Sequence, residues 1–317
     1  MKTSSRFFYI TIYLIPLICI LVSPQRYMTA TLDGLKLFAY NVFPSLFPFF
    51  ILTRILTNLG LGESVAKFVG KPLSKLFGTS ALGCYVFVLS ILSGYPVGAK
   101  MVSEYVKSGK ITLEEAKKII SFTSTSGPLF IVGAIGVNLI GDVKVGYVIL
   151  ISHFVGAFLN GLLYKGKNFS TQEVSMQVEC EDVLSDALSS SITSIFQVGA
   201  SIIFLNVLIV ALKDLKVISV FSGLLSYFIS DILRAEALAI GCVEITKGAQ
   251  LLCSLPNKKD IIVSLSTIIS FGGVSVMVQS MTFLRAIGIK TSYYLLTKIS
   301  QAILTYAVST LIVLFLY

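Results

Sequence analysis

Helix-breaking residues interrupt the apolar segments of the chain at three places. They are Ser93-Gly94-Tyr95-Pro96-Val97-Gly98-Ala99-Lys100, then Thr123-Ser124-Thr125-Ser126-Gly127-Pro128, and, in the other half, Ser270-Phe271-Gly272-Gly273-Val274-Ser275. Because glycine has little backbone bias and proline lacks an amide donor, helices break where these residues gather. A helix broken at membrane depth frees polar backbone groups, which survive only inside protein or beside a polar cavity. Interrupted apolar segments in corresponding parts of two halves indicate the binding site of a secondary transporter.

A broken membrane helix offers a place for an anion. Its second half begins with free amides and a partial positive charge, which suit a carboxylate or a phosphate. Lys100 follows the first break and could offset the charge of a ligand, or it could extend to the membrane interface; both readings stay open. The residues expected to bind substrate are Ser93, Gly94, Tyr95, Pro96, Gly98, Lys100, Thr123, Ser124, Thr125, Ser126, Glu244, Thr246, Gly272, Gly273 and Ser275.

Glu244 is the carboxylate to which the sequence points most directly. It lies in the apolar segment 236–252, and an ionisable group at that depth is a candidate for substrate contact or for coupling to H⁺ or Na⁺. Lys247 lies on the same helical face and could instead neutralise it. His153 lies in an apolar helix with no acidic residue within a turn, which favours packing or an interhelical hydrogen bond over a proton relay.

The composition is that of a polytopic membrane protein. Of 317 residues, 55% are hydrophobic and 13% are charged, about half of the ~25% charge that is usual in soluble proteins. We therefore expect an all-α fold with about 8–10 membrane segments, some of them broken or re-entrant. The net charge of +9 is explained by lysine and arginine at loop ends facing the cytoplasm and lipid headgroups, and we expect no nucleic-acid partner.

No enzyme motif or metal site is indicated. The five cysteines form no CxxC pair, which argues against a zinc site or a disulfide framework. The chain lacks G-x-S-x-G, HExxH and P-loop patterns. We expect no enzyme activity, no metal and no cofactor, with H⁺ or Na⁺ as a coupling ion.

The chain divides into two halves. Residues 1–28 are expected to form an N-terminal transmembrane helix, and residues 29–166 a first half with broken helices. Residues 167–188 are polar and acidic and predict an exposed linker, after which residues 189–317 form the second half. Laying 87–111 against 262–289 suggests an internal repeat, expected to be inverted.

The first two interruptions, with the capped segment Thr112-Leu113-Glu114-Glu115 between them, resemble the YlbJ family of sporulation integral membrane proteins, also called SpoVV. Phe47-Pro48-Phe49-Phe50 and Val243-Glu244-Ile245-Thr246-Lys247-Gly248 extend the resemblance, which covers about residues 40–290. It implies a nucleoside-recognition or Gate domain related to concentrative nucleoside transporters, with re-entrant hairpins that meet near the midplane. It also implies transport of dipicolinic acid across the outer forespore membrane of a spore-forming bacterium.

Three functions follow as expectations. The first is transport of dipicolinate or a similar small anion, and the second is nucleoside transport, for which Glu244 and Gln279 are suited but few amide side chains lie near the breaks. The third is a non-transporting assembly factor for spore maturation, in which the breaks serve packing. The partners expected are an anionic small molecule and the lipid bilayer, and a homo-oligomer is left open.

Overall fold

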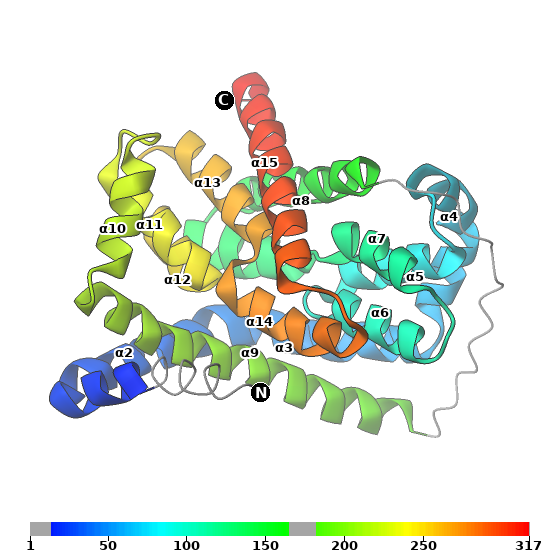
Figure 1. Ribbon diagram of the computed structural model, residues 1–317, viewed down its shortest axis with the longest axis horizontal. Helices are drawn as coiled ribbons and strands as arrows, with labels where there is room; N and C mark the ends of the chain where they lie inside the picture. The colour runs from blue at the N-terminus through cyan, green and yellow to red at the C-terminus, as the bar shows by residue number, and fades with distance from the viewer. Residues whose placement is uncertain (1–13, 165–181, 317) are drawn as a thin grey trace.

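The computed structural model describes residues 14–164 and 182–316, and every regular element in these ranges is a helix (Figure 1). The elements, in chain order, are α2 (Pro24–Leu37), the π-helical η1 (Phe38–Val42), α3 (Phe43–Asn58), α4 (Leu61–Phe77), α5 (Ala81–Ser93), α6 (Val97–Lys107), α7 (Leu113–Thr123), the π-helical η2 (Phe130–Ile140), α8 (Val143–Leu163), α9 (Val183–Asp214), α10 (Val217–Ser226), α11 (Ile232–Val243), α12 (Ile245–Cys253), α13 (Lys258–Phe271), α14 (Gly273–Leu284), the 3₁₀ turn η3 (Arg285–Ile287) and α15 (Thr291–Leu316).

Five helical stretches of the described residues are long and apolar enough to cross a bilayer, which requires about 20 residues. These stretches are Pro24–Asn58, Val143–Leu163, Val183–Asp214, Lys258–Ile287 and Thr291–Leu316. The expected all-helical membrane fold is therefore confirmed, and shorter apolar helices lie between the long ones. Residues 1–13 of the predicted N-terminal helix lie outside the described part.

Two pairs of short helices fold back on themselves as hairpins. In the first, α5 and α6 turn at Gly94–Pro96, and a Cβ on Gly98 would lie 2.6 Å from the Ser90 hydroxyl. In the second, α11 and α12 turn at Glu244, and a Cβ on Gly248 would lie 2.3 Å from the Gly241 Cα. Since real Cβ atoms do not approach so closely, glycine at these positions lets each hairpin close.

Each hairpin is followed by a helix that is broken but continues onward. The chain passes from α7 to η2 through an irregular stretch at 124–127, and from α13 to α14 at Gly272, whose φ is +86°. The described chain thus repeats a motif of hairpin and broken helix. The alignment of 87–111 with 262–289 was wrong, because it pairs the first hairpin with the second broken helix, whereas α5–α6 corresponds to α11–α12. The inverted orientation of the repeat stays a prediction.

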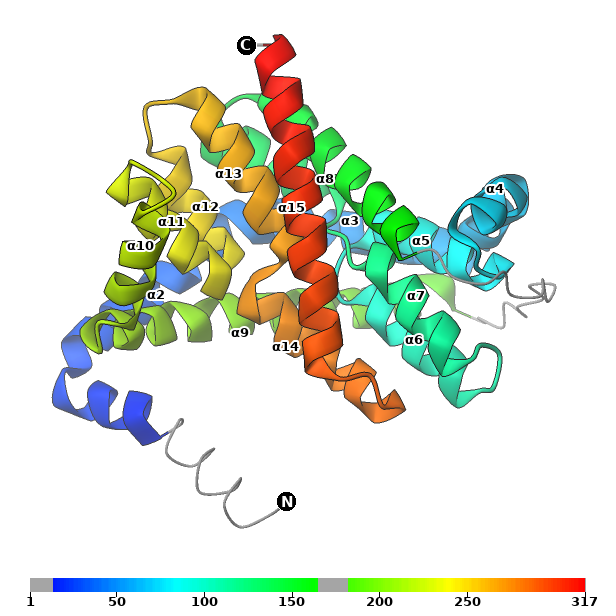
Figure 2. The same cartoon turned by 45° about the horizontal axis from the view of Figure 1, so that its top comes forward.

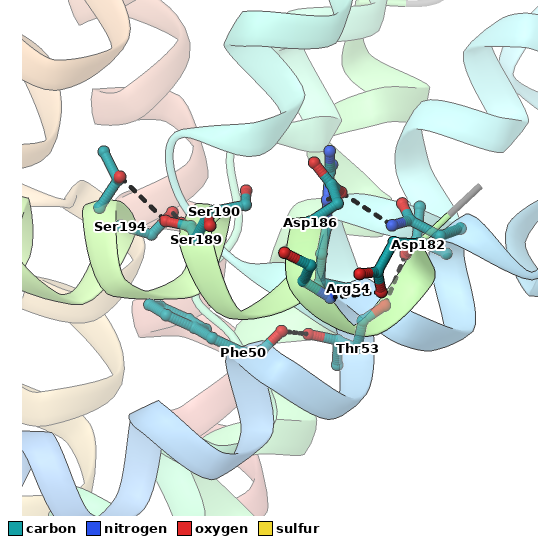
Figure 3. A network of polar contacts seen from close by, with 12 residues as sticks. Phe50, Thr53, Arg54, Asp182, Asp186, Ser189, Ser190 and Ser194 are labelled. Atoms are coloured by element: carbon teal, nitrogen blue, oxygen red, sulfur yellow. Dashed lines mark hydrogen bonds and ion pairs between the residues drawn. The ribbon is translucent and has the colours of Figure 1, made fainter. Parts of the chain in front are cut away.

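The helices α8, α13 and α15 pack against one another, and Figure 2 shows α15 in front of the other two. On another side, α9 lies along α2 and α3 (Figure 1). An ion pair joins α3 to α9, with Arg54 Nε 3.2 Å from Asp186 Oδ2 (Figure 3). The expected start of the second half at residue 189 differs from the observed helix, which begins at Val183 because Asp182 accepts the Ser185 amide and caps it.

Candidate substrate cavity at two hairpin tips

A cavity lies where the two hairpins and the two broken helices converge. Its free volume is about 650 Å³, including solvent at its mouth. Both hairpin tips contribute to the wall, as do both helix breaks and the helices α3 and α9. The lining residues are Leu46, Phe49, Phe50, Ser93, Gly94, Tyr95, Ser126, Gly127, Phe130, Val198, Ser201, Ile202, Glu244, Ile245, Thr246, Ser275, Val276 and Gln279.

The tip of the first hairpin rests against the first helix break. Gly94 adopts a φ of +72°, and a Cβ there would lie 2.6 Å from the Gly127 amide nitrogen. The Thr125 hydroxyl donates to the Ser90 carbonyl at 3.0 Å, which ties the break to α5. The Tyr95 hydroxyl crosses to the other half and donates to the Ile269 carbonyl at 2.6 Å. The glycines at this contact therefore allow the backbones of the hairpin tip and the helix break to approach closely, in addition to breaking the helices.

The tip of the second hairpin is built on Glu244. This residue is extended and 3% exposed, and its carboxylate accepts the Lys247 amide at 2.7 Å as the N-cap of α12. The Lys247 ammonium donates to Gln250 Oε1 at 2.9 Å rather than pairing directly with the Glu244 carboxylate. A Cβ on Gly273 would lie 3.0 Å from the Gly241 carbonyl oxygen, which places the second helix break against this tip. The Glu244 carboxylate at the cavity is thus hydrogen-bonded to the backbone of the helix that it caps.

His153 on α8 joins the two broken helices. Its Nε2 accepts the Ser126 amide at 2.9 Å, and its Nδ1 lies 2.7 Å from the Ser270 hydroxyl. Because a backbone amide can only donate, Nε2 carries no proton, and the neutral ring donates from Nδ1 to Ser270. This agrees with the expected interhelical hydrogen bond.

A second buried ionisable group at this junction is Lys298 on α15, which the helix-break motifs do not indicate. It is 1% exposed, and its ammonium donates to the Ser124 carbonyl and to Gln301 Oε1, both at 2.9 Å. Next to it, the Tyr294 hydroxyl lies 2.6 Å from the Ser124 hydroxyl and donates to Ser280 at 3.0 Å. A lysine inside a long apolar helix is the signal that could have identified this position.

The structure brings about half of the expected substrate residues to one cavity. Ser93, Gly94, Tyr95, Ser126, Glu244, Thr246 and Ser275 line it. Pro96, Gly98, Thr123, Ser124, Thr125, Gly272 and Gly273 belong to the same tips and breaks but do not line the wall. Lys100 is exposed on α6 and also lies outside the lining set.

Among the lining residues, the charged group is a carboxylate, and neither lysine nor arginine reaches the wall. Gln279, Ser201 and the aromatic rings of Phe49, Phe50 and Phe130 add a polar and a flat apolar surface. No group of three or more His, Cys, Asp or Glu side chains that could hold a metal occurs in residues 14–164 and 182–316.

No protein-family model matches the chain. The sporulation integral membrane protein YlbJ of Bacillus subtilis strain 168 is 28% identical over 313 residues, which cover 88% of this chain and 76% of that protein. Among solved structures, the transporter CNTnw in an inward-facing, substrate-bound state matches with a TM-score of 0.62 and 16% identity, over 87% of this chain and 75% of that one. A doubly substituted CNTnw in an outward-facing state matches with a TM-score of 0.53 and 16% identity, over 87% and 76%. The chain is therefore a homologue of the sporulation integral membrane protein YlbJ with the fold of a concentrative nucleoside transporter.

Proposed function

We propose that the protein is a secondary transporter of a small organic anion, and that this anion is dipicolinic acid, carried across the outer forespore membrane. The observation on which the proposal rests is the cavity bounded by both hairpin tips and both helix breaks. The transporter fold and the homology to a sporulation membrane protein support it.

An aromatic anion suits two features of the cavity wall. The first turn of α14, which carries Ser275, has no side-chain cap, and amides in the first turn of a helix suit a carboxylate. The hydroxyls of Ser93 and Ser126 add donors, and the rings of Phe49 and Phe50 suit a flat pyridine ring.

Glu244 opposes an anion unless it carries a proton, because two like charges within one cavity repel each other. We infer that substrate and proton enter together, or that the anion binds on the side away from Glu244. In either case Glu244→Gln is expected to strengthen anion binding, because it removes the charge and keeps an oxygen able to accept the Lys247 amide.

A nucleoside is the second candidate, and one observation favours it. Glu244 and Gln279 both line the cavity and offer the carboxylate and amide groups that ribose hydroxyls and a base would engage. For a nucleoside, Glu244→Gln is expected to weaken uptake, because a charged acceptor makes stronger hydrogen bonds than a neutral one. The same substitution therefore has opposite effects under the two proposals.

The test is uptake of radiolabelled dipicolinate and of uridine by proteoliposomes that contain the purified full chain. Gly94→Leu is expected to abolish uptake, because its side chain would collide with the Gly127 backbone. Gly109→Leu is the matched control, since Gly109 has a similar φ of +70° but nothing within 4 Å of a Cβ. It is expected to transport normally once folded.

Three outcomes separate the candidates. Saturable dipicolinate uptake that Gly94→Leu abolishes, with uridine inert, supports the anion transporter. Uptake of uridine alone supports the nucleoside transporter. Absence of both, from folded protein under H⁺ and Na⁺ gradients, contradicts transport and favours an assembly role in spore maturation.

A further inference from the structure

Lys298 occupies a junction between the two halves that the cavity chemistry does not use. Its ammonium binds the carbonyl of Ser124 in the first helix break, and Gly272 of the second break lies so near that a Cβ there would be 3.4 Å from Lys298 Cε. On a third side, Nζ lies 5.3 Å from the centre of the Tyr95 ring, which also lines the cavity. Both breaks and the first hairpin tip therefore meet at this one side chain.

No carboxylate compensates this charge in the part of the chain that the structure describes. The titratable side chains that face Lys298 are Tyr95 from the first hairpin, His153 from α8 and Tyr294 from its own helix. From α13 the neighbouring polar group is the Ser270 hydroxyl, which is bound to His153. Ionisable side chains inside membrane segments pair with one another or with backbone carbonyls, and they mark substrate pathways, ion pathways and proton relays.

The hydrogen bonds of Lys298 suit both protonation states. An ammonium has three N–H donors, and two of them are directed to the Ser124 carbonyl and Gln301 Oε1. A neutral amine keeps two N–H donors, so both bonds survive when the third proton leaves. In that step one N–H bond breaks, its electron pair stays on nitrogen, and the proton passes to a neighbouring water or hydroxyl.

A buried polar face of α15 extends along the helix from Lys298. Gln301 and Thr305 follow Lys298 on the same side of the helix, and Gln301 Nε2 and Thr305 Oγ1 have no hydrogen-bond partner among the described residues. Ser266 on the neighbouring α13 is equally buried, and its hydroxyl also lacks a partner there. Because buried polar groups usually have partners, and water can supply them, these side chains are candidate positions for bound water.

We propose that Lys298 is a proton-binding site of this protein, in addition to any proton that Glu244 takes up with the anion, and that the Lys298 proton is a coupling ion. The coupling part of this inference rests on the proposed transport function. A protonated Lys298 behind the Tyr95 ring attracts an anion in the cavity, and loss of the proton removes both this attraction and the cation–π contact with the ring. Anion and proton are then bound and released together.

The first experiment measures proton movement in proteoliposomes that contain the full chain and trapped pyranine, with dipicolinate or uridine added outside. In wild type, addition of the transported compound acidifies the lumen. Lys298→Gln is expected to lose this proton flux by more than about tenfold while still exchanging labelled for unlabelled compound across the membrane. Lys290→Gln, which removes an exposed charge just before the same helix, is expected to behave as wild type.

The variant Lys298→Arg distinguishes a proton-binding role of Lys298 from a purely structural role of its positive charge. Arginine keeps the positive charge and the donors but does not release a proton in proteins. If Lys298 binds the coupling proton, the arginine variant also loses the flux. Restoration of the flux by arginine would overturn the inference, because the role would then be structural.

The second experiment needs no substrate. The thermal midpoint in detergent is measured for wild type and Lys298→Met from about pH 5 to pH 9, since a group that titrates differently in the two states of folding makes stability depend on pH. A difference between the two proteins that changes with pH supports a titrating Lys298, and a constant difference overturns it. If neither compound is transported by wild type, the proposed function fails, and this pH dependence alone decides whether Lys298 binds a proton.

Discussion

Replacement of His153 by phenylalanine tests whether the two broken helices are held together by one ring. The substitution keeps a planar ring in a site that is fully buried, and it removes both ring nitrogens. The Ser126 amide and the Ser270 hydroxyl then lose their partner.

The loss in the free energy of unfolding depends on whether each unpaired group can find another hydrogen-bond partner. The Ser270 hydroxyl can rotate toward the carbonyl one helical turn back on α13, so its loss is small. The Ser126 amide lies in an irregular stretch and has no such alternative, and a buried unpaired donor costs about 1–3 kcal/mol. We therefore expect His153→Phe to reduce the free energy of unfolding by about 1–3 kcal/mol, a large share of the ~5–15 kcal/mol that is typical of folded proteins.

The measurement is equilibrium unfolding by SDS in mixed micelles, followed by circular dichroism. Tyr147→Phe is the matched control, because Tyr147 lies on the same helix and is 53% exposed, and it should leave the unfolding curve unchanged. In a double-mutant cycle, Ser270→Ala should cost less in the His153→Phe background than in wild type. If His153→Phe is as stable as wild type, or if the costs of the two substitutions simply add in the double variant, His153 does not hold the two broken helices together.

Two further predictions concern the closure of the second hairpin and the ion pair between Lys258 and Asp142. Gly248→Ala should open the second hairpin and reduce the free energy of unfolding by about 1–3 kcal/mol, because its Cβ would lie 2.3 Å from the Gly241 Cα. Gly223→Ala is the control and should be neutral or stabilising, because nothing lies within 4 Å of a Cβ there. Both variants are compared with wild type in the same unfolding assay, and unfolding curves that are equal for Gly248→Ala and wild type would contradict the hairpin packing. Lys258 donates to Asp142 at 2.8 Å and lowers the pKa of that carboxyl in the loop before α8. Because the folded pKa lies below the unfolded one, the stabilisation is present above about pH 4 and is lost as the pH falls through the folded value. Asp142→Asn should thus be less stable than wild type at neutral pH and equal to it in acid, and a pH-independent difference would exclude this ion pair as the cause.

The membrane fold and the helix breaks were predictable because they depend on local chemistry. Apolar runs of sufficient length indicate membrane helices, and the Gly94–Pro96 and Gly272–Gly273 breaks cluster residues that disfavour a helix. The tip at Glu244 was harder to predict, because no proline marks it. There the chain turns at an extended residue whose carboxylate caps the next helix, and Gly241 and Gly248 allow the two arms to touch. Such a turn depends on contacts between the arms, which a pattern along one segment does not reveal.

The two lysines show why proximity along the chain is a weak guide to a site. Lys100 was selected because it closely follows the first break, but Gly98, two residues earlier, is the position that faces Ser90 and Thr123 in the interior. Two residues turn an α-helix by about 200°, so Lys100 points away from that interior and is exposed. Lys298 is far from the first break in sequence, yet it follows the buried Tyr294 by four residues and therefore lies on the same inward face of α15. The orientation of a charged side chain thus follows from its position relative to the buried residues of its own helix, and on that criterion Lys298, and not Lys100, is directed into the interior.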